Sequence, residues 1–339
     1  MWQQPVSLIS YLLVAAVVVF VSIKLSDFVD LLDKKTKVSG AFLGGILLAA
    51  VTSLPELFTS LTATLLVKDN SLVVGNILGS NLFNFALFAI LFIFFFKHLV
   101  DAKVNKVHLL TMLFIALMYT CVTIGGYVFD YQHILLGWFN PMSIAILVIY
   151  AISVWKTPKE EEASEKKDVE TKLSVKQIIF WFVVLAIVLV GSSIGITYLT
   201  DWVVQSFSLG STFGGALFLG VATSLPEMTS TINLGRRKNY NAAFGNIVGS
   251  NIFNICIVIG LPVVIFGGFS VGNFQPIDLI MFIAASIILY IFAKTKGTIG
   301  RLEGALMLVF FAVYYTIMII INIKIKIRLI RNIISITYF

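Results

Sequence analysis

Long apolar runs recur along this chain and decide what it can fold into. The chain has 339 residues, of which 59% are hydrophobic and only 12% charged, far from the average of soluble domains. A helix rises about 1.5 Å per residue, so about 20 apolar residues cross the roughly 30 Å of hydrocarbon in a bilayer. The sequence therefore predicts an all-α, polytopic membrane protein with no separate water-soluble domain.

Charge-poor stretches bounded by loop signals predict ten transmembrane helices, at about 5–24, 41–67, 71–96, 107–128, 134–155, 177–200, 211–235, 240–267, 277–294 and 302–323. The run of Lys and Glu from Lys156 to Lys176 has almost no apolar content, so we expect a solvated linker there. The predicted organisation is a first five-helix repeat at 1–155, a linker loop at 156–176, a second five-helix repeat at 177–323 and a basic C-terminal tail at 324–339.

The two halves share two duplicated blocks. Residues 52–56, Thr-Ser-Leu-Pro-Glu, recur letter for letter at 223–227, and the ten residues from Gly75 recur from Gly245 with two conservative changes. The offsets are 171 and 170, so the connections match within one residue. An odd number of helices per repeat makes equivalent helices cross the membrane in opposite directions. The sequence thus predicts inverted repeats, an architecture in which transporters bind substrate at the midplane between the halves.

The distribution of Lys and Arg predicts the orientation. The net charge of +7 comes from residues in short inter-helix loops rather than on one basic face, which argues against nucleic acid as a partner. Cytoplasmic loops carry an excess of Lys and Arg. We therefore expect a cell or inner membrane location, an external N-terminus and a cytoplasmic 156–176 loop. The basic residues of the tail, Lys324, Lys326, Arg328 and Arg331, are an exception to this pattern.

Two glutamates carry the most specific signal. Glu56 is the only charged residue between Lys37 and Lys68, and Glu227 is the only one between Asp201 and Arg236. A carboxylate near mid-span costs at least about 2.5–3.5 kcal/mol, so it needs a cation, a proton or a water-filled cavity. A structural role, as a hydrogen-bonded or protonated side chain, is the alternative for each glutamate. Two glutamates in identical settings favour a functional role.

The surroundings of the glutamates indicate the kind of ion. Pro55 and Pro226 each remove a backbone donor and free the carbonyl one turn earlier, as in broken membrane helices that line an ion site. The neighbouring polar residues offer carboxylate, hydroxyl and amide oxygens without His or Cys. Such hard ligands suit Ca²⁺, Mg²⁺ or Na⁺ and not zinc or copper. We find no nucleophile or catalytic dyad, so we expect no enzyme and no cofactor.

The duplicated blocks resemble the two alpha repeats of the sodium/calcium exchanger family, within the calcium/cation antiporter superfamily. The resemblance extends over essentially the whole chain and implies ten helices in two inverted sets of five. It also implies alternating access, with the first and sixth helices moving across a more rigid eight-helix core. The 156–176 loop is too short for the calcium-sensing domain of animal exchangers, so the resemblance is to a prokaryotic type without a large regulatory loop.

The same resemblance implies a set of ion ligands. Glu56 and Glu227 are the implied central ligands for transported Ca²⁺ and Na⁺. Hydroxyl and amide oxygens of both halves and two backbone carbonyls are implied around them, namely Thr52, Ser53, Ser80, Asn84, Thr223, Ser224, Ser250 and Asn254, and the carbonyls of Ala49 and Gly220. Many relatives have Asp where Asn254 stands, a position associated with potassium co-transport in some exchangers. We therefore expect potassium-independent exchange.

Two other functions remain open at this point. A proton/calcium antiporter is the main alternative, because a buried glutamate can carry a proton at the site that binds calcium. Such proteins resemble this chain less well, since they typically lack the Thr-Ser-x-Pro-Glu block. A cation channel is a remote alternative, because it would need a pore ring from an oligomer. The lipid bilayer is an expected partner, and the sequence does not identify protein partners.

Overall fold

The structure, a computed structural model, describes residues 3–39, 42–67, 70–94, 106–128, 141–157, 171–206, 218–256, 276–296, 301–314, 316–317 and 319–320. Its elements are helices, as the apolar runs predict. In chain order they are α1 (Gln3–Lys35), a π-helical segment (Leu43–Leu48) that leads into α3 (Ala49–Thr52), α4 (Leu54–Thr62), a second π-helical segment (Ala63–Val67), α5 (Asn70–Phe94), α7 (Lys106–Val128), α8 (Pro141–Lys156), α9 (Val175–Ser206), α11 (Gly220–Thr223), α12 (Leu225–Arg236), α13 (Tyr240–Phe253) and α15 (Pro276–Lys296). Residues 301–314 form a further helix.

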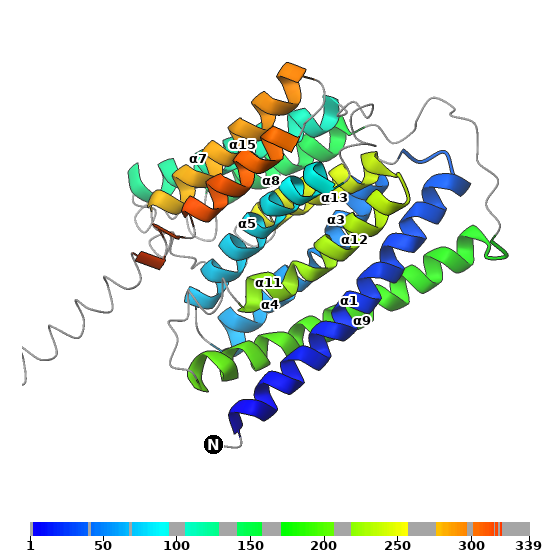
Figure 1. Ribbon diagram of the computed structural model, residues 1–339, viewed down its shortest axis with the longest axis horizontal. Coiled ribbons are helices and arrows are strands. Elements are labelled where there is room, and N and C mark those ends of the chain that lie inside the picture. Colours follow the sequence, from blue (N-terminus) through cyan, green and yellow to red (C-terminus); the bar gives the residue numbers. More distant parts are fainter. Residues whose placement is uncertain are drawn as a thin grey trace, which may run out of the picture.

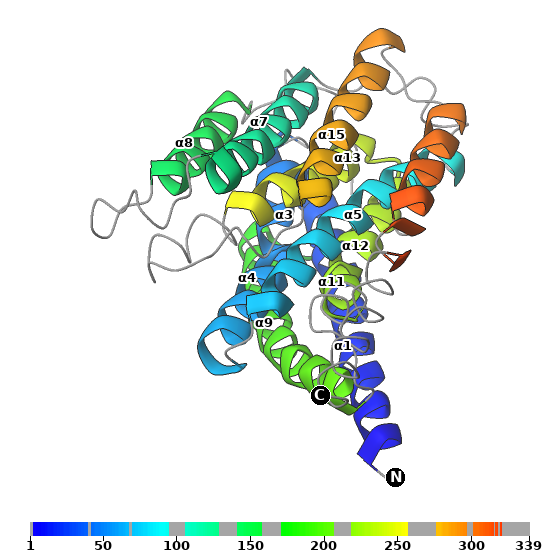
Figure 2. The same cartoon turned by 90° about the vertical axis from the view of Figure 1, so that its left-hand side faces the viewer.

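The helices are arranged in three layers (Figures 1 and 2). Helices α1 and α9 lie side by side along one flank, α4, α5, α11, α12 and α13 fill the middle, and α7, α8 and α15 cover the opposite flank. One buried apolar cluster joins the middle layer to the α7–α15 flank, through rings such as Phe85, Phe88 and Phe282. A second cluster, with Leu25 on α1 and Leu189 on α9, joins the other flank to the middle. The middle layer is thereby covered on both sides.

Several described helices have the length and composition of membrane spans. Five segments are long and apolar enough to cross a bilayer, namely Leu8–Lys35, Leu43–Val67, Gly75–Phe94, Lys106–Ile124 and Val175–Ser206. Helices α8 and α15 contain shorter apolar stretches. The outer faces of α1 and α9 expose large apolar side chains, including Leu13, Phe20 and Ile187. Such faces are suited to contact with lipid acyl chains.

Two predicted boundaries differ from the structure. Helix α1 continues to Lys35 instead of ending near residue 24, and α9 continues to Ser206 instead of ending near residue 200. The first apolar run ends at Lys24, but the chain stays helical beyond it, where Asp27 and Asp30 pair with Arg237. The predicted helices 134–155, 211–235, 240–267 and 302–323 extend beyond the described residues, as do the 156–176 linker and the 324–339 tail.

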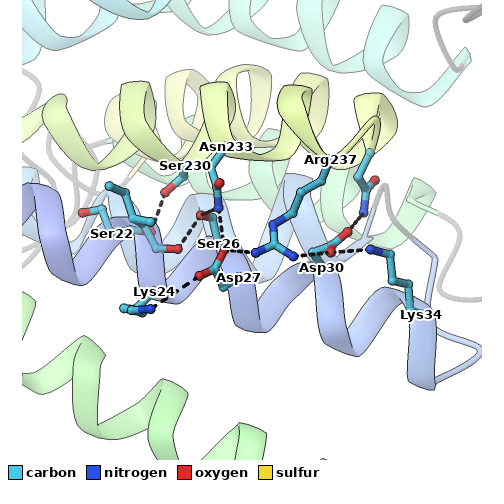
Figure 3. Close-up of polar contacts among 11 residues, drawn as sticks. Ser22, Lys24, Ser26, Asp27, Asp30, Lys34, Ser230, Asn233 and Arg237 are labelled. Carbon is cyan, nitrogen blue, oxygen red and sulfur yellow. Dashed lines mark hydrogen bonds and ion pairs between the residues drawn. The ribbon is translucent and has the colours of Figure 1, made fainter. Parts of the chain in front are cut away.

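A polar network fastens the end of α1 to α12 (Figure 3). Arg237, just after α12, places Nη2 2.5 Å from Asp27 Oδ1 and Nη1 3.1 Å from Asp30 Oδ2. Lys34 also pairs with Asp30, at 2.6 Å, and Asn233 donates to Asp27 at 2.7 Å. The Asp30 side chain is fully buried, and removing one partner of such a charge costs more than the pair contributes. The network therefore holds the end of α1 beside α12 in the conformation that the structure shows.

The two broken helices run antiparallel. In both views the chain runs from α3 down to α4 and from α11 up to α12. Since α3–α4 and α11–α12 contain the duplicated Thr-Ser-Leu-Pro-Glu blocks, equivalent segments of the two halves point in opposite directions, as the repeat predicts.

Glycine permits the close crossing of α13 with the segment that leads into α3. A Cβ atom on Gly249 would lie 2.1 Å from the carbonyl oxygen of Gly45, and one on Gly44 would lie 2.2 Å from that of Ala242. Both contacts are with backbone, which cannot rotate away. Close approach through small residues is a common way for membrane helices to pack, and here it brings the duplicated blocks of the two halves together.

Candidate functional site

Each duplicated Ser-Leu-Pro-Glu sequence starts a helix inside the protein. Ser53, at φ −92° and ψ 2°, occupies the N-cap position of α4, and Ser224, at φ −84° and ψ −2°, occupies that of α12. Proline fits the first turn, where no backbone donor is needed. Glu56 and Glu227 then fall in the first turn of α4 and α12, where the positive end of the helix dipole stabilises a negative charge. Both glutamates are fully buried.

The carboxylate of Glu56 lies among hydroxyls of both halves. Oγ of Ser80 is 3.1 Å from Glu56 Oε1, 3.2 Å from the carbonyl oxygen of Gly220 and 3.0 Å from Oγ1 of Thr223. Ser80 has one proton to donate, so it satisfies one of these oxygens at a time. The first-half glutamate is thus tied by Ser80 to α11 of the second half.

The carboxylate of Glu227 accepts hydrogen bonds from two serines. Ser53 Oγ donates to Oε1 at 3.0 Å, and Ser250 Oγ lies 3.2 Å from the same oxygen. Ser250 also lies 3.4 Å from Oγ1 of Thr52. The second-half glutamate is therefore bonded to a serine of each half.

Two asparagines outside the predicted ligand set orient the threonines. Asn76 accepts a bond from Thr223 at 3.0 Å, and Asn246 accepts one from Thr52 at 3.3 Å. The amide nitrogen of Asn76 in turn donates to Thr59 and Ser60, and that of Asn246 donates to Thr231. The sequence could have identified both asparagines, because both belong to the duplicated block that starts with Gly-Asn. These reciprocal bonds between the halves are what a two-fold axis between them would produce.

Several buried polar atoms of the site have no hydrogen-bond partner within the described part of the chain. They are Oε2 of Glu56, Oε2 of Glu227, Oγ of Ser224, Oδ1 of Asn254 and both amide atoms of Asn84. Buried polar groups are nearly always bonded, so a cluster of unbonded oxygens is a place where a ligand can bind. With the exception of the Asn84 nitrogen, these atoms are oxygens of the kinds that coordinate Ca²⁺ and Na⁺.

The two predicted backbone carbonyls also lie at the breaks. Ala49 O accepts from the backbone nitrogen of Ser53 at 3.0 Å, and Gly220 O accepts from that of Ser224 at 3.1 Å. Oγ1 of Thr52 lies 3.4 Å from Ala49 O, and Oγ1 of Thr223 lies 3.4 Å from Gly220 O. Both carbonyls are therefore next to the predicted threonine ligands.

All twelve residues predicted as ion ligands are buried, and hydrogen bonds join nine of them into two clusters, one around each glutamate. The cluster of Glu227 contains Thr52, Ser53 and Ser250, and the cluster of Glu56 contains Ser80, Gly220 and Thr223. Ala49 joins through Thr52. The buried side chains of Asn84 and Ser224 have no hydrogen-bond partner among the residues described, and Asn254 bonds to Asn81, which the ligand prediction did not include.

The chain matches known membrane proteins over most of its length. The family of the sodium/calcium exchanger protein matches residues 6–156 and 177–320. An uncharacterised membrane protein of Methanocaldococcus jannaschii is 25% identical over 285 residues, which are 81% of this chain and 86% of that protein. The sodium/calcium exchanger MaX1 of Methanosarcina acetivorans is 32% identical over 113 residues, 31% of this chain and 30% of that protein.

The fold also matches a solved exchanger. A structure of the sodium-calcium exchanger NCX_Mj, soaked with 2.5 mM Na⁺ and 0.1 mM Sr²⁺, superposes with a TM-score of 0.64 at 21% identity, covering 92% of this chain and 99% of that one. At this identity the likeness shows a shared fold. The helical membrane fold predicted from the repeats is thereby confirmed.

Proposed function

The chain belongs to the sodium/calcium exchanger protein family, and from this premise we propose that it exchanges Ca²⁺ for Na⁺ by alternating access, with the ions held between Glu56 and Glu227. Membership makes the chain an integral, multi-pass cation antiporter rather than an enzyme. Family membership does not establish the coupling ion, the ligands or the transport cycle of this chain, so these three are our proposal.

The observation that carries the proposal is the pair of half-satisfied carboxylates. Each glutamate is fully buried and uses Oε1 for serine hydroxyls, while Oε2 has no partner among the described residues. An ionised carboxylate in such a setting is costly unless it is paired. Two of them can neutralise one Ca²⁺, and the same pair with the surrounding hydroxyl and amide oxygens can hold several Na⁺ ions. Competition of the two cations for overlapping oxygens is the requirement for antiport.

The oxygen shell favours Na⁺ over the proton as the coupling ion. A proton needs one carboxylate oxygen, whereas a metal cation needs several oxygens around it. Ser224, Asn84 and Asn254 offer buried oxygens that are unbonded among the residues described. The oxygens that surround Ca²⁺ can therefore also complete the shells of Na⁺ ions, whereas protons on the two glutamates would leave these oxygens unused when Ca²⁺ has left.

The arrangement of the layers supports alternating access. Helices α1 and α9 lie side by side, outside the middle layer that contains the glutamates. They would move across that layer, while the glycine crossing between α13 and the segment before α3 keeps the ligands of the two halves together.

The orientation is part of the proposal, with the N-terminus outside and the 156–176 loop in the cytoplasm. A Ser164→Cys variant tests it, since Ser164 lies within that loop. We expect an impermeant thiol reagent to label the cysteine only after the cells are opened. Labelling in intact cells would show that the loop lies outside and that the proposed orientation is wrong.

Reconstituted transport tests the exchange itself. Purified protein in proteoliposomes should accumulate Ca²⁺ when a Na⁺ gradient is imposed at clamped pH. A pH gradient without Na⁺ should give no accumulation. The opposite result would identify a proton/calcium antiporter, and gradient-independent leakage of cations would indicate a channel.

A further inference from the structure

Three buried polar side chains from three helices form a relay that ends at the candidate ion site. Asn254, directly after α13, donates from Nδ2 to Oδ1 of Asn81 on α5 at 2.9 Å. Asn81 donates from its own Nδ2 to the hydroxyl oxygen of Tyr119 on α7. All three side chains have no exposed surface. The relay therefore runs from the α7 flank into the middle layer.

The relay determines which end of the Asn254 amide is free. Because Nδ2 of Asn254 is used by Asn81, the atom left unbonded among the described residues is Oδ1, which is buried. An amide oxygen attracts a cation and the amide NH₂ group repels one. If Asn81 turned end for end, its NH₂ group would face Asn254, and Asn254 would then present its own NH₂ group to the ion.

Tyr119 is a rigid anchor for the far end of the relay. Its ring stacks on Phe282 of α15, with centroids 4.8 Å apart and an interplanar angle of 11°. Both rings belong to the buried apolar cluster of the α7–α15 flank. The hydroxyl is thus a polar group held in an apolar surrounding, and its partner is Asn81.

The other half of the protein shows what happens without such an anchor. Asn251 is the counterpart of Asn81 in the duplicated block, and Asn84 is the counterpart of Asn254. Neither amide atom of Asn251 or Asn84 has a hydrogen-bond partner in the described part of the chain. The relay is therefore a feature of one half, although the sequence blocks are duplicated.

We propose that Tyr119 is a positioning residue for cation binding, which acts through Asn81 to hold Asn254 with its amide oxygen toward the ion. The inference rests on the proposed function, because it takes Asn254 as an ion ligand. It adds two residues, Tyr119 and Asn81, that do not touch the ion and that determine how well Asn254 binds it.

The decisive variant is Tyr119→Phe, which keeps the ring on Phe282 and removes only the hydroxyl. Sodium-driven Ca²⁺ uptake into proteoliposomes is measured over a range of Ca²⁺ concentrations. We expect the KM for Ca²⁺ to rise about tenfold, the effect of losing one well-oriented hydrogen-bonded ligand, with little change in the maximal rate. Asn81→Ala removes the residue between Tyr119 and Asn254 and should raise KM by a similar factor. Either variant can then test the relay if the other folds poorly.

A matched control and a double variant separate positioning from stability. Tyr314→Phe makes the same chemical change on another buried tyrosine beside Phe282, at 6.4 Å between centroids, and should leave KM unchanged. In an Asn254→Ala background, Tyr119→Phe should have no further effect on KM, since residues that act through one another are not additive. A role in stability alone would lower the melting temperature in both backgrounds without moving KM.

The outcomes distinguish this inference from the proposed function. A wild-type protein without sodium-driven uptake would overturn the proposed function itself. Exchange by the wild type, with a raised KM in Asn254→Ala and an unchanged KM in Tyr119→Phe, would overturn the relay and leave the function standing. An equal rise in KM from Tyr119→Phe with and without Asn254 would also overturn the relay.

Discussion

The two glutamates have identical sequence surroundings and different hydrogen-bond surroundings. Ser53 donates its hydroxyl to Glu227 across the interface between the halves, whereas the hydroxyl of its counterpart Ser224 has no partner among the residues described. Glu227 thus accepts bonds from two serines, whereas Glu56 accepts one from Ser80. The duplication determines which residues are present. The packing between the halves determines which of them are bonded before an ion arrives.

The backbone differs in the same region. Ala49 of the first half corresponds to Gly220 of the second, and the second position has no room for a side chain. A Cβ atom on Gly220 would lie 2.9 Å from Cα of Gly79 and 3.1 Å from the backbone nitrogen of Ser80. The second half therefore approaches α5 more closely than an alanine would allow. The comparison predicts four results, from the largest effect to the smallest.

Replacing either glutamate by glutamine tests whether the different surroundings matter for the central ligands. We expect Glu56→Gln and Glu227→Gln each to lower sodium-driven Ca²⁺ uptake by at least about 100-fold. A carboxylate about 4 Å from a cation contributes several kcal/mol even at an effective dielectric constant of about 20. Folding should be retained, because an amide is less costly to bury.

Asp201→Asn is the matched control, since it makes the same chemical change at a carboxylate on α9 that bonds to Gln205. It should transport like the wild type. Normal exchange by one well-folded glutamine variant would mean that the halves are functionally unequal and would remove that glutamate from the mechanism.

Exchanging glycine and alanine at positions 220 and 49 tests the difference in backbone packing between the halves. Gly220→Ala should destabilise the protein by about 1–3 kcal/mol, the usual cost of overpacking, and should weaken Ca²⁺ binding because α11 must move away from Ser80. Ala49→Gly should cost about 1 kcal/mol or less and keep exchange. Melting temperatures and Ca²⁺ uptake measure both effects. Equal behaviour of the two variants would show that the close approach of α11 to α5 is not needed.

Removing the two cap serines tests the hydrogen-bond difference. Without ions, Ser53→Ala should lower stability by about 1 kcal/mol, because Glu227 loses one of two donors, whereas Ser224→Ala should change it little. With saturating Ca²⁺, both variants should gain less stability than the wild type. The check is thermal unfolding in detergent with a chelator and with added Ca²⁺. If Ser224→Ala lowered the stability of the ion-free protein, the inferred difference between the halves would be wrong.

The dependence of exchange on potassium tests a position at which the two halves carry the same residue. Asn84 and Asn254 are both neutral, so neither position supplies a third carboxylate that would favour a monovalent cation beside bound Ca²⁺. Removing potassium from both sides of the membrane, at clamped voltage, should leave sodium-driven Ca²⁺ uptake unchanged. A strict requirement for potassium would show that a neutral amide suffices for its binding.

The sequence was sufficient for the fold and the buried glutamates because each leaves a strong pattern. Glu56 and Glu227 are isolated charges in apolar runs, and the duplicated blocks identify their neighbours. The relay could not be predicted in the same way, because Tyr119 lies outside the duplicated blocks and its role depends on which helix packs beside α5. The end of α1 was missed because the first apolar run ends at Lys24, while Arg237, which pairs with the acidic residues beyond it, lies far away in sequence.

That distance has a consequence for how the protein is made. Asp30 and Arg237 are 207 residues apart, and at about 5–20 residues per second a ribosome needs about 10–40 s to synthesise the chain between them. During this interval Lys34, one helical turn after Asp30 and 2.6 Å from it, is the partner that α1 itself supplies. The network between α1 and α12 can form only after Arg237 has been synthesised, so it joins the first helix of one half to the other half late in synthesis.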